Sequence, residues 1–474
     1  MSRPNILFFM LDQVSAEVLR PDSPCRTPNL DRILQRGLRV DRAYTPNPIC
    51  TPARASLQTG LWPHNHGALH VHLPPTSPPD VAMLRSDKRH WAQQLEAAGY
   101  RTGHWGKWHV DYWHNVNRYG WQQWDPAESM HTPTFDRVWT VGQPSPNPGY
   151  SGGGTGLTAT PLEQRGQWRH YLRAKGFLEE ALSGGRPWAC MMSFSGPHSS
   201  KDAHIDLVED YLAMDLPLPA SRYHDLADRP EIYRLSQKPW QGMTDEDHRK
   251  WRACYYAAVE EHDRMFGLLL DQVEAAGQLD DTIIVFTTDH GDALGAHGVY
   301  TKILFAHEPV YNIPLAICGP GIAADTVSRA RVGLQDLAPT LCSLTGVEQL
   351  PEVDGRDASA LFAEPAAHED DWQVGHAENY GSQLLFTQRL IWEGDWKLVY
   401  NGFGTSELYD LGTDPDELHN RIDDPAADAR LRRLAAALWR HCRDTGDTEF
   451  LSTPPCFRFF PYGPGIMDEE PVAG

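Results

Sequence analysis

The sequence predicts an α/β protein: a large domain with a mostly parallel sheet flanked by helices, followed by a small C-terminal α+β domain with an antiparallel sheet. Four continuous apolar runs in the 474-residue chain are typical of strands buried on both faces of a parallel sheet. Helical stretches separate these runs, and such alternation indicates helices on the faces of the sheet. The expected strands are 5–11, 188–194, 281–287 and 314–318, and the expected helices are 29–37, 90–98, 167–182 and 245–276.

The C-terminal part of the chain has a different pattern. The composition changes at 363–371, which indicates a linker. Short β patterns then occur at 389–392, 396–400 and 407–409, and the apolar face of 428–442 predicts a helix. We therefore expect the large domain to span residues 1–365 and the C-terminal α+β domain to span residues 372–474.

Two further segments differ in composition from the rest. Residues 131–160 are rich in Pro, Gly, Ser and Thr, which predicts a long surface loop. The tail 456–462 is rich in aromatic residues. We expect this tail to pack on its own chain or on a second copy of it, so a homo-oligomer is one expected outcome.

The overall composition excludes several classes of partner. Acidic residues outnumber basic ones by 63 to 42, for a net charge of -21, which argues against nucleic acid. No apolar run approaches about 18 residues, so no membrane span is expected. Residues 1–11 lack the pattern of a secretory signal, so a cytoplasmic location is expected. The eight cysteines include no C-x-x-C pair, which suits neither a zinc site nor a disulfide framework.

Metal-binding side chains follow three of the expected strands. Asp12 and Gln13 follow the first, Asp289 and His290 follow the third, and His198 comes shortly after the second. Ligands of α/β sheets bind beyond the carboxyl ends of strands, so these residues are expected to share one site. Two carboxylates, an amide oxygen and an imidazole suit Ca2+, Mg2+ or Mn2+. The alternative for each Asp is a cap of a turn or helix.

Cys50 begins the run CTPARASLQTG, residues 50–60. Pro52 is tolerated in a first helical turn, so Cys50 is expected at a helix N-terminus, where the helix dipole favours an anionic nucleophile. Arg54 would lie one turn on, on the same face. The alternative is an ordinary buried cysteine.

The run that begins at Cys50 resembles the first signature of the type I sulfatase family of the alkaline phosphatase superfamily, in which the cysteine is oxidised to formylglycine. The run GYRTGHWGKWH, residues 99–109, resembles the second signature. The resemblance implies that Lys107 holds the charged oxygens of the ester and that His109 deprotonates the covalent intermediate. It further implies that Lys302 contacts the sulfate and that His198 protonates the leaving alcohol.

The predicted metal ligands also resemble those of the sulfatases. The resemblance implies that Asp12, Gln13, Asp289, His290 and the modified Cys50 hold one divalent cation, Ca2+, with Mn2+ or Mg2+ as alternatives. Asp289 would also accept the proton of the nucleophile, and Arg54 would stabilise the resulting alkoxide. Most of the family has Asp and Asn where this chain has Gln13 and His290. That pattern is similar to the choline sulfatase and phosphonate monoester hydrolase branch.

The resemblance implies hydrolysis of a sugar, aryl or alkyl sulfate monoester, after a formylglycine-generating enzyme has matured Cys50. A phosphonate monoester or phosphodiester hydrolase with the same nucleophile is one alternative, and a non-catalytic sulfatase-like binding protein is the other. Aromatic side chains interleaved with polar ones suit a sugar or aryl group. On that basis the substrate-binding candidates are His66, His70, Trp113 and Asn115.

Overall fold

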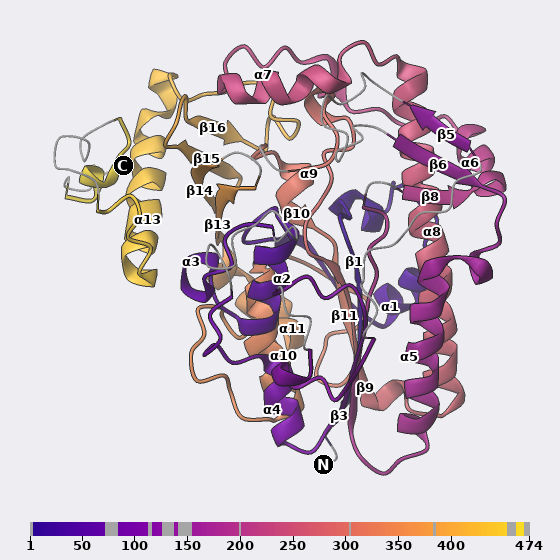
Figure 1. Ribbon diagram of the computed structural model, residues 1–474. Coiled ribbons are helices and arrows are strands. Elements are labelled where there is room, and N and C mark those ends of the chain that lie inside the picture. Colours follow the sequence, from indigo (N-terminus) through magenta and orange to yellow (C-terminus); the bar gives the residue numbers. More distant parts are fainter. Residues whose placement is uncertain are drawn as a thin grey trace.

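A large twisted sheet forms the centre of the protein (Figure 1). The structure is a computed structural model that describes residues 3–71, 84–111, 116–125, 137–140, 154–198, 201–302, 305–382, 385–452 and 461–468. Within them the strand order is β10-β2-β11-β9-β1-β7-β3-β4, with β12 paired to β2. The strands are β1 (Asn5–Leu11), β2 (Gly37–Tyr44), β3 (Arg101–Gly106), β4 (Gln123–Trp124), β7 (Trp188–Ser193), β9 (Thr282–Thr288), β10 (Asn312–Ile313), β11 (Leu315–Cys318) and β12 (Thr326–Gly333).

The four strands at the centre, β9-β1-β7-β3, are parallel and end at one level. Leu11 lies opposite Thr288, Met10 opposite Ser193, and Ser193 opposite Gly106. The residues that follow these strands therefore meet at one edge of the sheet, as expected for a ligand site.

The prediction of a mostly parallel sheet is confirmed, with one difference in β11. This strand pairs antiparallel with both β9 and β2. Its run of apolar residues is buried throughout. An apolar run thus indicates burial on both faces of a sheet, and it carries no information about strand direction.

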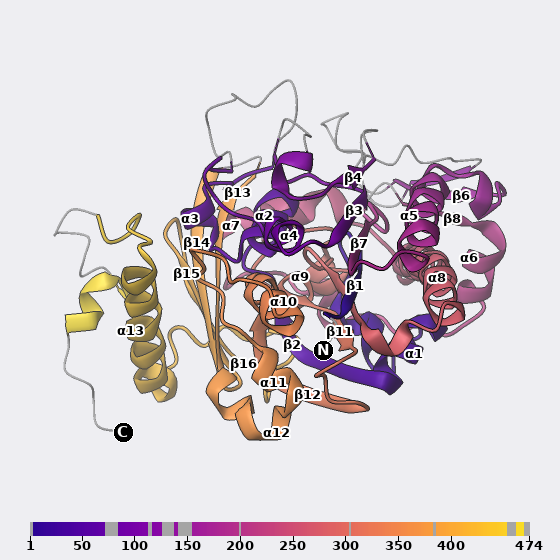
Figure 2. The same cartoon turned by 90° about the horizontal axis from the view of Figure 1, so that it is seen from below.

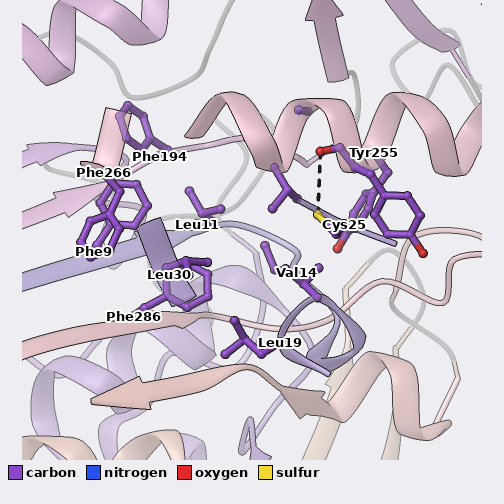
Figure 3. Close-up of a cluster of buried hydrophobic side chains, with 14 of the residues drawn as sticks. Phe9, Leu11, Val14, Leu19, Cys25, Leu30, Phe194, Tyr255, Phe266 and Phe286 are labelled. Atoms are coloured by element: carbon purple, nitrogen blue, oxygen red, sulfur yellow. Dashed lines mark hydrogen bonds between the residues drawn. The ribbon is translucent and has the colours of Figure 1, made fainter. Parts of the chain in front are cut away.

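Helices cover both faces of the sheet, and alternate side chains of β1 explain why (Figures 1 and 2). Phe9 belongs to one core cluster with residues of α1, α5 and α8, whereas Phe8 belongs to a second cluster with residues of α2, α4 and α10. Figure 3 shows Phe9 beside Phe266 and Phe286 in the first cluster. These helices are α1 (Pro28–Arg36), α2 (Cys50–Thr59), α4 (Trp91–Ala97), α5 (Gly166–Leu182), α8 (Asp245–Ala275) and α10 (Leu337–Thr345).

The C-terminal part forms a separate antiparallel sheet, as predicted, of strands β13 (Val374–Gly381), β14 (Leu385–Glu393), β15 (Trp396–Asn401) and β16 (Glu407–Asp410). Side chains such as Leu390 face the large domain, and alternate ones such as Ile391 pack against α13 (Asp428–Thr445). That helix runs three residues beyond its predicted end and stops at Gly446, which has a φ of 81°. The glycine tolerates this left-handed conformation and caps the helix.

One prediction about an irregular segment is wrong. Part of the expected loop 131–160 forms a small sheet, in which β5 (Arg137–Thr140) and β6 (Gly154–Thr158) pair with each other and β6 pairs with β8 (Lys201–His204). The expected linker at 363–371 contains helix α12 (Pro365–His368). The remaining short helices are α3 (Pro63–His66), α6 (Ile205–Leu212), α7 (Glu231–Gln237), α9 (Glu308–Tyr311) and α11 (Ser359–Ala363).

Two further expectations concern the aromatic tail and the absence of a membrane span. Residues 453–460, most of the aromatic tail, lie outside the described residues. In the part of the chain that the structure describes, no helix is both long and apolar enough to cross a membrane.

Candidate active site

Four of the five predicted metal ligands meet at the carboxyl edge of β1 and β9. Asp12 and Gln13 follow β1, and Asp289 and His290 follow β9 at the matching level. Oδ1 of Asp289 accepts hydrogen bonds from the backbone N–H of Gln13 (3.2 Å) and of His290 (3.0 Å). This shared carboxylate holds the two strand ends together, because it satisfies a backbone donor from each.

Helix α2 points its N-terminus at this edge. Cys50 is its first residue, as the sequence predicts, and Arg54 lies one turn on. The Arg54 guanidinium donates from Nε to Oδ2 of Asp289 (2.7 Å) and from Nη2 to Oδ2 of Asp12 (3.1 Å). Arg54 is 2 % exposed, so this charge-assisted pairing takes place away from water and fixes α2 against the strand ends.

Two lysines add positive charge around Cys50. Lys302 Nζ lies 3.0 Å from Sγ of Cys50, and Lys107 Nζ donates to Oδ2 of Asp12. Burial raises the pKa of the Cys50 thiol, but Lys107, Lys302 and His290 together outweigh burial and hold this pKa well below its usual value. The site therefore stabilises negative charge at position 50.

A glycine places Lys107 in the site. Gly106, the last residue of β3, has a φ of 90°, and an added Cβ would lie 2.0 Å from the carbonyl oxygen of Ser193. Only glycine fits this close approach. The turn directs the backbone N–H of Lys107 to the same carbonyl oxygen (2.7 Å).

Several atoms that could bind a metal ion surround the positively charged Nζ of Lys302, which is the arrangement that a cation needs. Nδ1 of His290 lies 2.9 Å from the Gly291 carbonyl, to which it donates, so Nε2 is the ring nitrogen left to bind an ion. Lys302 Nζ lies 2.9 Å from that Nε2 and 3.3 Å from Oε1 of Gln13. Asp12, Cys50, Asp289 and His290 offer ligand atoms within 4.8 Å of one another. With Oε1 of Gln13 the set has three oxygen donors, from Asp12, Gln13 and Asp289, which fits a divalent cation.

Two histidines lie at the more open side of the site. Cys50 is 2 % exposed, whereas His109 and His198 are both half-buried. His109 hydrogen-bonds with Cys50, and its pKa is lowered by burial and by the charge of Lys107. The ring of His198 lies 6.5 Å from that of His290, centroid to centroid. Both imidazoles are therefore within reach of a group that enters beside Cys50.

The predicted substrate-binding residues fare less well. His66 is fully buried, and its ring bonds Ser56 Oγ (3.0 Å) and the backbone N–H of Ala68 (3.1 Å). The prediction for His66 is wrong, because both ring nitrogens are committed to the chain. His70 is half-buried, with Nδ1 3.2 Å from the carbonyl of Gly381. Trp113 and Asn115 lie outside the described residues.

Sequence reasoning missed two polar residues of the site. Ser193, the last residue of β7, accepts a hydrogen bond from Nη1 of Arg54 (2.8 Å). Oδ2 of Asp292 accepts one from Nε2 of Gln13 (2.6 Å), which turns the amide oxygen of Gln13 towards Lys302. A polar residue that ends a buried parallel strand was the available signal for Ser193, and proximity to Asp289 was the signal for Asp292.

Comparison with known proteins identifies the family. A model of the sulfatase family matches residues 4–347. The chain belongs to the sulfatase family. A model of the C-terminal region of N-sulphoglucosamine sulphohydrolase also matches, over residues 295–444. This match confirms two predictions: the resemblance of the chain to the type I sulfatases, and its assignment as a sulfuric ester hydrolase.

Individual relatives agree with this assignment over almost the whole chain. An uncharacterized sulfatase of Escherichia coli, YidJ, is 28 % identical over 453 residues, 92 % of this chain and 87 % of the relative. The choline-sulfatase of Rhizobium meliloti is 29 % identical over 466 residues, with the same coverage. The solved phosphonate monoester hydrolase of Silicibacter pomeroyi has a TM-score of 0.74 at 24 % identity, covering 94 % of this chain and 97 % of that one. The last similarity shows a common fold.

Proposed function

We propose that this sulfatase hydrolyses a sulfate monoester to an alcohol and inorganic sulfate, with a formylglycine derived from Cys50 as the nucleophile. The observation that carries the proposal is the position of Cys50. It begins a buried helix, and its Sγ lies 3.0 Å from Lys302 Nζ and 3.2 Å from Nε2 of His290, beside Asp12 and Asp289. Positive charges at this position stabilise an anionic nucleophile. They also stabilise the anionic group that is being transferred.

The residues that would hold a divalent cation are Asp12, Gln13, Asp289 and His290, together with the modified Cys50. Ca2+ is the proposed ion, because oxygen donors predominate, and Mn2+ or Mg2+ are the alternatives. Such an ion supplies positive charge that favours the deprotonated nucleophile and the transferring group.

The side chains divide the remaining work. One hydroxyl of the hydrated formylglycine attacks sulfur, and Asp289 accepts its proton while Arg54 offsets the developing charge. Lys107 and Lys302 stabilise the charge on the transferring group. His198 protonates the leaving alcohol, and His109 then takes the proton of the second hydroxyl, so that sulfate leaves and the aldehyde forms again. Burial lowers the pKa of His109, which keeps this imidazole neutral and able to accept a proton.

The substrate class is proposed as a sugar, aryl or alkyl sulfate. Relatives include a choline-sulfatase and an N-acetylglucosamine-6-O-sulfatase. His70, Trp113 and Asn115 remain candidates for contacts with the organic part of the ester. A formylglycine-generating enzyme is the proposed maturation partner.

One observation favours a second candidate function, hydrolysis of a phosphonate monoester or phosphodiester. Gln13 and His290 stand at positions that are Asp and Asn in most of the family, which gives this site one carboxylate fewer. The same nucleophile could attack the phosphorus of such an ester, and the same cationic groups could stabilise its transfer, as for sulfur.

The first test is the mass of the peptide that contains Cys50, isolated from protein made with an active maturation enzyme. We expect formylglycine or its hydrate, and unmodified cysteine would contradict the mechanism. Rates on 4-nitrophenyl sulfate and on a phenylphosphonate ester, measured on the same preparation, then decide the substrate class. A faster reaction with the phosphonate ester would favour the second candidate.

A further inference from the structure

The turn that carries the proposed metal ligand Gln13 has a strained backbone. Gln13 is fully buried and has a φ of 69°, in the left-handed region that residues with a side chain rarely adopt. Asn and Asp tolerate this region better than Gln does. A residue stays in such a conformation only where its surroundings fix it from several sides. The contacts around this turn therefore determine where the ligand oxygen of Gln13 lies.

Two of these contacts come from the segment that follows β9. The backbone N–H of Gln13 donates to Oδ1 of Asp289 (3.2 Å), and the side-chain amide donates to Oδ2 of Asp292 (2.6 Å). These bonds hold one side of the turn. The carbonyl group of Gln13 and the backbone N–H of Ser15, which lie on the other side, bond to a different element.

That element is helix α8, through Tyr255. The hydroxyl of Tyr255 donates to the carbonyl oxygen of Gln13 (2.9 Å) and accepts from the backbone N–H of Ser15 (2.9 Å). A tyrosine hydroxyl has a single proton to donate, and the carbonyl of Gln13 receives it. All three residues are buried, so water does not compete for these two bonds.

The ring of Tyr255 is held by packing. Tyr255 belongs, with Phe9 and Phe266, to the core cluster between α8 and the sheet (Figure 3). Packing of this kind fixes the rotamer of a supporting side chain, which then holds its neighbour precisely. The hydroxyl therefore grips the turn from a rigid base.

We propose that Tyr255 is a positioning residue of the metal site, whose hydroxyl joins the two ends of the Gln13 turn and so keeps the amide oxygen of Gln13 among the ligands. This inference rests on the proposed function, which includes the divalent cation. The hydroxyl reaches Gln13 through the backbone, so Tyr255 acts on the metal through the conformation of that residue. Oε1 of Gln13, the atom so placed, lies 3.3 Å from Nζ of Lys302.

The test is Tyr255→Phe in the full-length protein, made with the maturation enzyme. After removal of metals with a chelator, the affinity for Ca2+ is measured by calorimetry, with Mn2+ in its place if Ca2+ does not bind. We expect the affinity to fall about 10-fold or more, because loss of a group that orients a metal ligand commonly lowers affinity about 10- to 100-fold. The kcat for the ester that the wild type hydrolyses should recover at saturating cation, because the reacting groups are intact.

Tyr256→Phe is the matched control. Tyr256 is the next residue of the same helix and is equally buried, and its hydroxyl bonds Oε1 of Glu17 (2.6 Å) and Arg252, both outside the turn. This variant loses a buried hydroxyl without loss of a bond to residues 12–15, so its affinity for the cation should be unchanged. Wild-type affinity in Tyr255→Phe, or equal losses in the two variants, would overturn the proposal.

Gln13→Gly tests whether Tyr255 acts through Gln13. Glycine adopts a φ of 69° without strain and carries no amide oxygen, so in this background Tyr255 has no ligand to position. The loss caused by Tyr255→Phe should then disappear, whereas a general loosening of α8 would lower the affinity equally in both backgrounds and overturn the proposal. If Tyr255→Phe does not fold alone, Gln13→Gly should restore folding, and an unfolded double variant would also overturn the proposal.

Failure of this inference is distinguishable from failure of the proposed function. The affinity for the cation is measured without a substrate, so it decides the role of Tyr255 even if the protein hydrolyses neither ester. That result would contradict the proposed function alone. A wild-type protein that binds neither Ca2+ nor Mn2+ would overturn both proposals.

Discussion

The cluster of charge around Arg389 and the one in the active site differ in how their charges are balanced. Around Arg389, the guanidinium donates to Asp447, to Glu449 (3.0 Å) and to the hydroxyl of Tyr380 (2.9 Å). Glu378, next to it, pairs with His64 (2.8 Å). Carboxylates thus surround a single guanidinium, and the cluster is satisfied within the chain.

The active site has the opposite balance. Arg54 and Lys107 bond the two carboxylates of the site, those of Asp12 and Asp289. Lys302 adds a third positive charge, beside Cys50 and Gln13. Arg389, Asp447 and Glu378 are about as buried as the charged residues of the active site, so burial alone does not distinguish a functional site from a structural one. The excess of positive charge does, because an anionic substrate can satisfy it.

The largest effect on activity is expected from changes at Cys50, the proposed nucleophile of the active site. Cys50→Ala should lower kcat for 4-nitrophenyl sulfate by at least about 10³-fold. Cys50→Ser should transfer one sulfate group and then stop, because serine lacks the second hydroxyl that releases sulfate. Burst kinetics and the mass of the Cys50→Ser protein check this result, and sustained turnover by that variant would contradict it.

A change in the cluster around Arg389 should alter the stability of the protein. Arg389→Met leaves the buried carboxylate of Asp447 without its cation, which should lower the free energy of unfolding by about 3–5 kcal/mol. Urea unfolding followed by circular dichroism measures the change. Arg432→Met, which removes an exposed pair with Asp428, is the control and should have little effect. Equal stability of the two variants would show that the Arg389 cluster is not structural.

The same cluster predicts a dependence of stability on pH. Burial lowers the pKa of His64, but Glu378 outweighs burial and raises it from 6.5 to about 9. Because the folded pKa is the higher one, the stabilisation is fully present below pH 6.5 and is lost as pH rises through 9, a change of about 3 kcal/mol. Unfolding free energies between pH 6 and pH 10 test this, and His64→Gln should flatten the profile over that range.

The smallest expected effect concerns the orientation of one metal ligand. Asp292 accepts from the amide of Gln13 (2.6 Å) and from the backbone N–H groups of Leu294 and Thr301 (2.9 Å each). Asp292→Asn should weaken this hold on Gln13 and lower the affinity for the divalent cation about 10-fold. Activity measured against cation concentration should recover at saturation, and an activity loss that saturation does not reverse would assign Asp292 another role.

The sequence predicted the residues that lie at strand ends more reliably than those that depend on tertiary contacts. Asp12, Gln13, Asp289 and His290 were predictable because parallel neighbours end at one edge. Arg54 was predictable from helical spacing. Lys107 and Lys302 were expected only from resemblance, since a lone lysine in a loop has no periodic pattern.

The failures have physical causes as well. The direction of β11 depends on the path of the chain around the sheet, which an apolar run does not encode. His66 looks like its polar neighbours in the sequence, and only the packing of α2 against α3 buries it. The strands β5 and β6 lie in a segment that is rich in Pro, Gly, Ser and Thr. That composition is typical of loops, so the sequence predicted a loop there.

Helix α2 has a consequence for how the protein must be made. All ten of its residues are buried, Cys50 among them. An enzyme that oxidises Cys50 could not reach its thiol in the folded chain, because Cys50 is 2 % exposed. If Cys50 is converted to formylglycine as proposed above, the conversion would therefore precede folding, and the two events would compete in time. A molecule that folds first would be well packed, stable and permanently inactive, so the specific activity of a preparation would record the order of events during its synthesis.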